Sequence, residues 1–485
     1  MITGFLASNI KACNTKGIDI KPITILMGEN SSGKTSFLQA LSLLTVNKIL
    51  GNDIKKIKYN NPFHKLGTTS KFKNKENIVI LGFEFKDKND LKYNITCFYN
   101  NELSDDYGYL NQVILNYEKF KERIFFNYEK GKYIITLDKI IDGKENLFTE
   151  KIIKDGNINR IFFKTDFKTL KLYHYPQELE EEIIKNYKNF NKLEENLKDI
   201  FSILDEHINS IKHISKIQEI ITYYNYNSDY IGYNAEKYKD IAKYLKDTIF
   251  LKKAIKNIFN YDLDNIDIFG NFYLNQKIKV DIMKKYYNKF FYLKDYMLFN
   301  STNELSVLSE NDKLFLLKDN KRIELIKIDD ELYKYYETQS LGLDMFGSSI
   351  NNLIPILTQF AKNREHPEKY NITIVEEPEL GLHPQAQAKL VETLFGEDDY
   401  YKTQTTILET HSSHIVNKLR YLIYQGKIKP EEVVIYYKKQ DNDEFIQINI
   451  DKFGQFDRDF PKDFYDATLA NLLEMKRAKR KNASS

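Results

Sequence analysis

One short segment, Gly28-Glu29-Asn30-Ser31-Ser32-Gly33-Lys34-Thr35, constrains this chain more than any other. It has the form G-x-x-x-x-G-K-[ST], in which backbone N–H groups and the start of a following helix surround a phosphate. The apolar run Ile23–Met27 before it predicts a short buried strand, and apolar residues at helical spacing after it predict a helix. This context favours a phosphate-binding loop over the alternative, a Gly/Ser-rich turn that caps an ordinary helix. In such a loop Lys34 neutralises the β- and γ-phosphate oxygens and Thr35 places its hydroxyl on Mg²⁺.

Composition narrows the class of protein. A chain of 485 residues is expected to form about two or three domains. The formal net charge of +3 is too close to zero to indicate a nucleic-acid partner by itself. Cys13 and Cys97 form neither a disulfide framework nor a metal-ligand spacing. Because no apolar run reaches the ~18 residues of a membrane span and no signal-peptide layout is present, we expect a cytoplasmic protein without membrane contact.

A second candidate element follows the β-branched apolar run Asn371–Val375, which predicts a buried strand. The strand ends in Glu376-Glu377-Pro378-Glu379. An acidic pair at this place suits a nucleotide-hydrolysing site, in which Glu376 would hold Mg²⁺ through water and Glu377 would act as general base. The alternative, a solvated acidic turn, is less favoured because a phosphate-binding loop is present in the same chain.

A histidine follows a third predicted strand, Thr405–Glu409, in the run Thr410-His411-Ser412-Ser413-His414. The carboxyl end of a strand lies on the ligand edge of an open parallel sheet. We therefore expect His411 to reach the γ-phosphate and report its presence, and we interpret His414 as structural.

A turn of small residues, Gly347-Ser348-Ser349, precedes a predicted helix that contains Asn351 and Asn352. Such a helix start is a second place where an anion can bind. We expect it to reach the phosphate of a second copy of the chain. The alternative is an ordinary helix start that is capped by Ser348 or Ser349.

The middle of the chain, residues 101–335, carries no motif of this kind. A near-heptad apolar pattern from Ile183 to Ile211 predicts a long helix, which we interpret as packed on the protein's own core rather than as an arm for a partner. A second helix is predicted over Glu236–Asn260. Strands are expected over Ile2–Ile10, Asn77–Phe85, Leu91–Tyr99, Tyr109–Tyr117 and Arg123–Leu137, and near Ile278, Leu314 and Ile323–Ile328.

Taken together, the loop at 28–35, the small-residue helix start, E-E-P-E-L-G-L-H-P and E-T-H-S resemble ABC-type ATPases of the RecF, SMC and OLD-like branch. These are often described as AAA family ATPases and include the ATPase subunits of antiphage systems such as Septu and PARIS. The resemblance covers residues 1–100 and 335–440. It implies an α/β fold, an ABC-type P-loop ATPase head with a mixed sheet. The expected domains are an ATPase lobe at 1–100, a largely helical insertion at 101–335, a second ATPase lobe at 336–440 and a small C-terminal α+β extension at 441–485, with a hairpin and a basic helix.

The resemblance implies ATP and Mg²⁺ as cofactors and a head-to-head homodimer, or a higher homo-oligomer, that encloses ATP between one P-loop and the partner's signature. Lys34, Glu377 and His411 match catalytic positions, and Thr35 and Glu376 match metal positions. Ser349 and Asn352 stand where the family has a glycine and a glutamine, so slow turnover is expected. The residues that match nucleotide-binding positions are Gly28, Asn30, Ser31, Ser32, Gly33, Lys34, Thr35, Ser36, Ser348, Ser349 and Asn351.

The expected function is therefore a regulatory or sensor ATPase, in bacterial antiphage defence, that controls a separately encoded nuclease or toxin effector. This expectation rests on a complete hydrolytic set without a recognisable TOPRIM nuclease. Two alternatives stay open: a RecF-like DNA-repair ATPase, and a nucleotide-locked scaffold with little turnover. The basic run Lys476–Lys481 is interpreted as a solvated helix end, with contact to nucleic acid as the other reading.

Overall fold

The computed structural model divides into two compact units, which are described separately. Unit 1 comprises Met1–Tyr238 and Asn352–Ser485, and unit 2 comprises Lys239–Asn351. The residues that the structure describes are 2–11, 13, 15, 17–49, 56–60, 66, 78–86, 92–101, 106–117, 122–129, 132–139, 161–166, 171–173, 210–214, 249–266, 272–285, 289–292, 305–310, 313–318, 321–343, 346–367 and 370–458.

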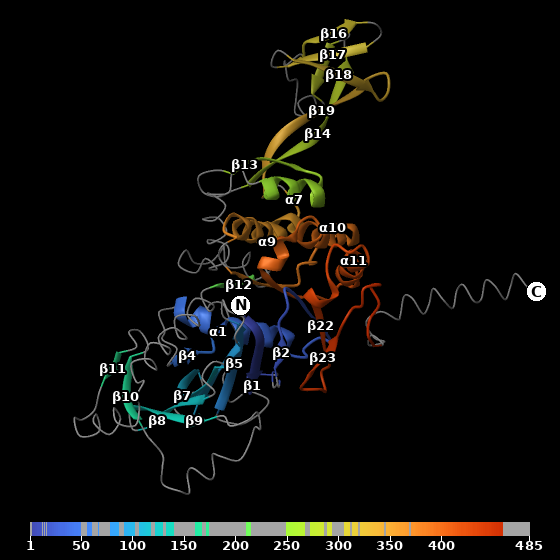
Figure 1. Cartoon of the computed structure of the whole chain (residues 1–485). Coiled ribbons are helices and arrows are strands. Elements are labelled where there is room, and N and C mark those ends of the chain that lie inside the picture. Colours follow the sequence, from blue (N-terminus) through green and yellow to red (C-terminus); the bar gives the residue numbers. More distant parts are fainter. Residues whose placement is uncertain are drawn as a thin grey trace, which may run out of the picture. The chain divides into compact units, whose positions relative to one another are not determined.

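A six-stranded sheet forms the centre of unit 1 (Figure 1). Its order is β12-β20-β21-β3-β22-β23, in which the first five strands are parallel and β23 is antiparallel. Every residue of β3, β20, β21 and β22 is buried, as expected for parallel strands that are covered on both faces. The strands are β3 (Ile23–Gly28), β12 (Ile211–Ile214), β20 (Ile372–Glu376), β21 (Thr405–Glu409), β22 (Val433–Lys438) and β23 (Phe445–Ile448).

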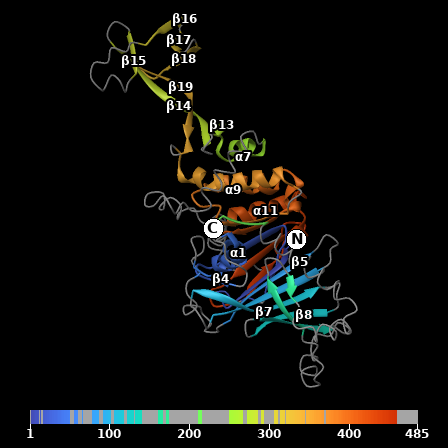
Figure 2. The same cartoon turned by 90° about the vertical axis from the view of Figure 1, so that its left-hand side faces the viewer.

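Helices cover both faces of this sheet (Figures 1 and 2). Helix α1 (Lys34–Ile49) lies on one face, and α10 (Pro384–Phe395) and α11 (Ser413–Tyr424) lie on the other with the part of α9 (Ser348–Glu365) that belongs to unit 1. Ser412 accepts the N–H groups of residues 414 and 415 and so begins α11. Two short 3₁₀ turns, η3 (Asp399–Thr403) and η4 (Pro430–Glu432), precede β21 and β22.

A ten-stranded sheet packs on the other side of α1, where Phe37 of α1 meets Phe5 with ring centroids 5.1 Å apart. The core therefore joins both sheets through α1 and includes Leu26, Ile374 and Val434. The strands of this sheet are β1 (Ile2–Ser8), β2 (Ile18–Asp19), β4 (Lys56–Lys58), β5 (Ile78–Lys86), β6 (Lys92–Asn100), β7 (Tyr107–Tyr117), β8 (Glu122–Glu129), β9 (Lys132–Lys139), β10 (Ile161–Asp166) and β11 (Lys171–Tyr173).

Unit 2 contains α7 (Ile249–Phe259) and an antiparallel sheet with the order β13-β14-β19-β18-β17-β16, with β15 paired to β14. A small separate core joins residues of β14, β17, β18 and β19. The strands are β13 (Asp262–Ile266), β14 (Phe272–Lys285), β15 (Lys289–Tyr292), β16 (Val307–Glu310), β17 (Lys313–Lys318), β18 (Lys321–Lys327) and β19 (Leu332–Gly342).

The α/β class with a mixed sheet is confirmed, and the strands predicted in the first 100 residues are present. The described part of 101–335 consists mainly of strands, and the described end of the helix predicted over Glu236–Asn260 is α7, so the prediction of a largely helical insertion stays a prediction for the residues outside the described ranges. In β18 every residue except Ile323 and Leu325 is exposed, so the alternation of apolar and polar residues that marks a half-buried strand is weak there. Most of the predicted helix from Ile183 to Ile211 lies outside the described residues, and its last residue begins β12.

The expected C-terminal hairpin is present as β22 and β23, but it belongs to the central sheet because β22 pairs with β3. The predicted basic helix at 476–481 lies outside the described residues. Within the described ranges, none of the helices combines the length and the apolar character that crossing a membrane requires.

Candidate active site

The loop between β3 and α1 has the backbone of a phosphate-binding loop. Gly28 and Gly33 have φ of +141° and +103°, and Ser31 has φ of +58°. A Cβ on Gly28 would lie 2.0 Å from the carbonyl oxygen of Lys438, so this position has no room for a side chain. Glycine is required there by both conformation and space.

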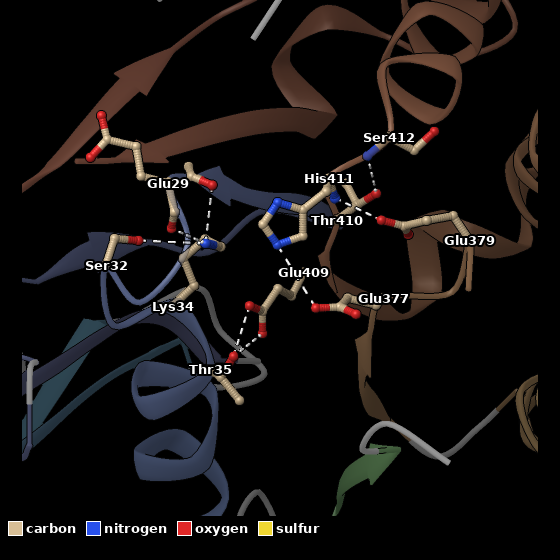
Figure 3. A network of polar contacts seen from close by, with 11 residues as sticks. Glu29, Ser32, Lys34, Thr35, Glu377, Glu379, Glu409, Thr410, His411 and Ser412 are labelled. Carbon is tan, nitrogen blue, oxygen red and sulfur yellow. Dashed lines mark hydrogen bonds and ion pairs between the residues drawn. The ribbon is translucent and has the colours of Figure 1, made fainter. Parts of the chain in front are cut away.

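Lys34 opens α1 and turns its ammonium back into the loop (Figure 3). Its Nζ donates to the carbonyl oxygens of Gly28 at 3.1 Å and Glu29 at 2.7 Å, and to Ser32 Oγ at 3.5 Å. Lys34 and Ser32 are buried. The positive charge is thus held inside the ring of loop backbone, where a phosphate would need it.

The end of β22 supports the other side of the loop. The N–H of Glu29 donates to the carbonyl oxygen of Lys438 at 3.0 Å, and the N–H of Gln440 donates to Glu29 Oε2 at 2.7 Å. The ammonium of Lys438 in turn donates to the carbonyl oxygen of Asn442. Strand β22 and the turn after it therefore help to shape the loop.

Glu409, at the end of β21, contacts the loop directly. The Thr35 hydroxyl lies 2.8 Å and 2.9 Å from the two carboxylate oxygens of Glu409. Strand β21 is the neighbour of β3, and Glu409 is only 2% exposed. Glu409 is not among the site residues predicted from the sequence, although an acid at the end of a buried strand, just before Thr410-His411, is a usable signal.

Glu376, at the end of β20, makes a different contact. Its Oε1 lies 2.9 Å from Nε2 of His213 in β12, and His213 Nδ1 lies 2.8 Å from Ser42 Oγ in α1. Glu376 and Glu409 are register partners on parallel strands, so their side chains extend from the same face of the sheet. The assignment of Glu376 to the metal stays a prediction, and His213 was not selected by the sequence analysis.

Glu377 and His411 approach each other across the ends of β20 and β21 (Figure 3). His411 Nε2 lies 3.8 Å from Glu377 Oε1. Glu377 has φ of +44°, which is uncommon for a residue with a side chain, and its N–H donates to the carbonyl oxygen of Glu409 at 2.8 Å. Ligand atoms of Glu377, Glu409 and His411 all lie within 4.8 Å of one another.

The backbone around His411 is held by Glu379, whose Oε1 accepts the His411 N–H at 2.6 Å. Burial raises the pKa of the Glu379 carboxyl, and the nearby Glu377 also raises it. Ser412 donates its N–H to Thr410 Oγ1 at 3.0 Å, which tightens the same turn. His411 therefore extends from a well-supported turn.

The remaining predicted residues fall into two groups. In the loop, Asn30 and Ser31 are exposed and Ser36 is buried. Ser348, Ser349 and Asn351 belong to unit 2, at the start of α9, and are not among the residues that meet in unit 1. The Asn351 amide donates to the carbonyl oxygens of Leu343 at 3.2 Å and of residues 346 and 347 at 3.4 Å each, so it closes the turn before α9.

These groups fit a triphosphate with a divalent cation. The glycine-lined loop and Lys34 provide a place for negatively charged oxygens, and the hydroxyl and carboxylate oxygens of Thr35, Glu409 and Glu377 suit Mg²⁺. His411 adds a nitrogen that can donate or accept a hydrogen bond at the same place.

Comparisons with known proteins identified a curated relative of this chain. The chain is 26% identical over 434 residues to Endonuclease GajA of Bacillus cereus (strain HuB5-5), a match over 83% of this chain and 54% of GajA. The chain thus spans about half the length of that curated relative.

Two solved structures are also similar to the chain. The SMC head domain from Thermotoga maritima has 9% identity and a TM-score of 0.35, with coverage of 93% of this chain and 99% of the SMC chain. The recombination mediator protein RecF has 10% identity and a TM-score of 0.29, with coverage of 92% and 98%. Both TM-scores lie below 0.5, so these likenesses are weak. A family model described as AAA ATPase domain matches residues 1–416, which is most of the chain, and the chain therefore belongs to this AAA ATPase family.

Proposed function

We propose that this chain binds ATP with Mg²⁺ and hydrolyses ATP slowly. The observation that carries the proposal is the contact between Thr35 of the loop and Glu409, which is 374 residues further along the chain. Glu377 and His411 lie at the same place. Four side chains from three distant segments thus surround one site that suits phosphate and a divalent cation.

Each side chain has a part in the proposed reaction. Lys34 binds negatively charged oxygens, and Thr35 binds the cation through its hydroxyl. Bound Mg²⁺ would neutralise charge that develops on the transferred phosphoryl group. The Glu377 carboxylate takes the proton of the attacking water, and His411, 3.8 Å from its Oε1, orients the carboxylate and reports the γ-phosphate.

We further propose that the chain works as a homodimer or a higher homo-oligomer. Gly347 and Ser348 at the start of α9 are exposed, and among the described residues nothing lies within 4 Å of a Cβ built on Gly347. Such an open helix start suits an anion that comes from outside the chain. In the proposed dimer Ser348, Ser349 and Asn351 approach the nucleotide bound by the partner.

The biological role that we propose is regulatory, in bacterial antiphage defence and in the cytoplasm. The match to GajA, which is named an endonuclease, supports an association between this ATPase and nucleic-acid cleavage. We propose that a separately encoded nuclease or toxin acts with it.

Phosphate release from ATP by the purified protein, with Mg²⁺ and then with EDTA, tests the proposal. Glu377→Gln should lower the rate by about 10²–10⁴-fold because the general base is lost, and ATP-dependent dimers should accumulate in light scattering. Glu331→Gln, on an exposed turn of unit 2, is the matched control and should leave the rate unchanged. Nucleotide binding without phosphate release would favour the nucleotide-locked scaffold. Hydrolysis that requires DNA and falls steeply with salt would favour the RecF-like alternative.

A further inference from the structure

The side chain of Gln387, in the first turn of α10, bridges two segments that meet at the candidate active site. Its Nε2 donates to the carbonyl oxygen of Leu382 at 2.8 Å, and its Oε1 accepts the Ser412 hydroxyl at 2.5 Å. Leu382 lies in the loop between β20 and α10, and Ser412 follows His411 at the start of α11. On the basis of the proposed function, we propose that Gln387 is a positioning residue, which holds His411 in place beside Glu377.

The chemistry of the contacting atoms fixes how the Gln387 amide is oriented. The carbonyl oxygen of Leu382 can only accept a hydrogen bond, so the NH₂ group of Gln387 faces it and the amide oxygen faces Ser412. The Ser412 hydroxyl gives its single proton to Gln387, while its oxygen accepts the N–H groups of His414 and Ile415 at 3.1 and 3.2 Å. Gln387 therefore sets the direction of the hydroxyl group that caps α11.

The β20–α10 loop is folded tightly, so a contact at Leu382 can act on Glu377. The N–H of Leu380 donates to the carbonyl oxygen of Glu377 at 3.1 Å, and the N–H of Leu382 donates to that of Glu379 at 2.9 Å. The N–H of Glu377 in turn donates to the carbonyl oxygen of Glu409 at 2.8 Å. Two consecutive turns thus connect the point where Gln387 binds with the proposed general base.

A second contact between the loop and the histidine turn comes from Glu379. Its Oε1 accepts the backbone N–H of His411 at 2.6 Å (Figure 3). Residues 411 and 412 are therefore both tied to the β20–α10 loop, the first by Glu379 and the second through Gln387. His411 Nε2 lies 3.8 Å from Glu377 Oε1. Removing the Gln387 amide breaks one of these ties, so the imidazole should lose its fixed place beside the carboxylate.

Substitutions at Gln387 separate positioning from nucleotide binding. Gln387→Leu keeps about the same side-chain size and removes both hydrogen bonds, whereas Gln387→Glu keeps an acceptor for Ser412 and loses the donor to Leu382. Gln385→Leu is the matched control, because Gln385 is exposed in the first turn of the same helix. Single-turnover ATP hydrolysis and ATPγS calorimetry are measured on the full-length chain. Thermal unfolding verifies the fold, and Gln387→Glu carries the test if Gln387→Leu does not fold.

We expect Gln387→Leu to hydrolyse ATP about 10- to 100-fold more slowly in a single turnover, because a small displacement of a catalytic group has an effect of this order. Its ATPγS dissociation constant should stay within about twofold of the wild type, since the lost interaction serves the reaction and not ground-state binding. Gln387→Glu should be intermediate, and Gln385→Leu should match the wild type. When His411→Ala is already present, Gln387→Leu should cause no further loss, because residues that act as one unit are not additive.

Hydrogen exchange measures the same positioning without turnover. In Gln387→Leu the amides of residues 378–383 and 410–416 should exchange at least about threefold faster, while those of residues 28–35 keep the wild-type rate. A wild-type rate of hydrolysis in Gln387→Leu, a further loss in the His411→Ala background, or unchanged exchange would each overturn the inference. A wild type that hydrolyses no ATP refutes the proposed function instead, and the exchange result then still decides whether Gln387 holds the His411 turn.

Discussion

Replacing Gly28 by alanine tests whether the fit between the loop and β22 is as tight as the structure shows. Gly28 has φ of +141°, where a residue with a side chain is strained by about 1–3 kcal/mol. The new Cβ would lie 2.0 Å from the carbonyl oxygen and 2.7 Å from the nitrogen of Lys438. Both are backbone atoms of a strand inside the central sheet, so a rotamer change cannot relieve the contact.

The expected loss of folding stability is the sum of the backbone strain at position 28 and the close contact of the new Cβ with Lys438. Overpacking at a tight site costs about 1–3 kcal/mol, so with the backbone strain the total is about 2–6 kcal/mol. A loss of 1 kcal/mol lowers the melting temperature of a domain of about 150–250 residues by about 2–4 °C. We therefore expect Gly28→Ala to melt at least about 4 °C below the wild type. The shift of the Lys438 carbonyl should also break its bond with the Glu29 N–H and weaken nucleotide binding.

Differential scanning calorimetry and ATPγS titration measure the two effects. The matched control for stability is Gly347→Ala, because the described residues leave the space around a Cβ at Gly347 open to 4 Å. Its stability should stay within about 0.5 kcal/mol of the wild type. If Gly28→Ala melts and binds nucleotide like the wild type, the close approach of β22 to the loop is not a feature of the protein.

Four further expectations concern single side chains. Lys34→Ala removes a buried ammonium that donates to the loop, and it should weaken ATPγS binding by about 10- to 150-fold in calorimetry. Burial raises the pKa of Glu379, so the folded state binds more protons than the unfolded state above about pH 4.3, and stability falls as pH rises through the folded pKa. Glu379→Gln should flatten this fall in melting temperature, and an unchanged pH profile would contradict it. Asn363→Ala leaves a buried threonine hydroxyl of β20 without its 3.0 Å donor and should cost about 1–3 kcal/mol in chemical denaturation. Burial raises the pKa of both Cys13 and Cys97 to about 12, so the native protein at pH 8 should resist iodoacetamide for hours and react only when unfolded, as mass spectrometry would show.

The sequence predicted the local parts of the site because each part has a short-range signature. The strand, loop and helix around Lys34 follow from apolar spacing and glycine positions, and the ends of β20 and β21 follow from buried apolar runs. These patterns depend on a few neighbouring residues, so tertiary contacts are not needed to recognise them.

The parts that the sequence did not predict depend on strand order. His213 reaches Glu376 because β12, from the middle of the chain, pairs with β20, whose partner residues lie 161 positions further along, as in Ile211 with Ile372. Glu409 reaches Thr35 because β21 is the neighbour of β3. No local periodicity states which strand lies beside which, so the contact of Glu409 with Thr35 and that of Glu376 with His213 are visible only in the folded chain.

The pairing of β22 with β3 limits how far the protein can be shortened from its C-terminal side. The family match ends at residue 416, yet Val433–Lys438 pairs along the whole of Ile23–Gly28. A fragment that ends at residue 416 would lack β22 and would expose the edge of β3 beside the phosphate-binding loop, which promotes aggregation. A shorter fragment should therefore keep β22 and also the turn at Gly454, whose carbonyl oxygen accepts a hydrogen bond from Arg420 Nε at 2.7 Å.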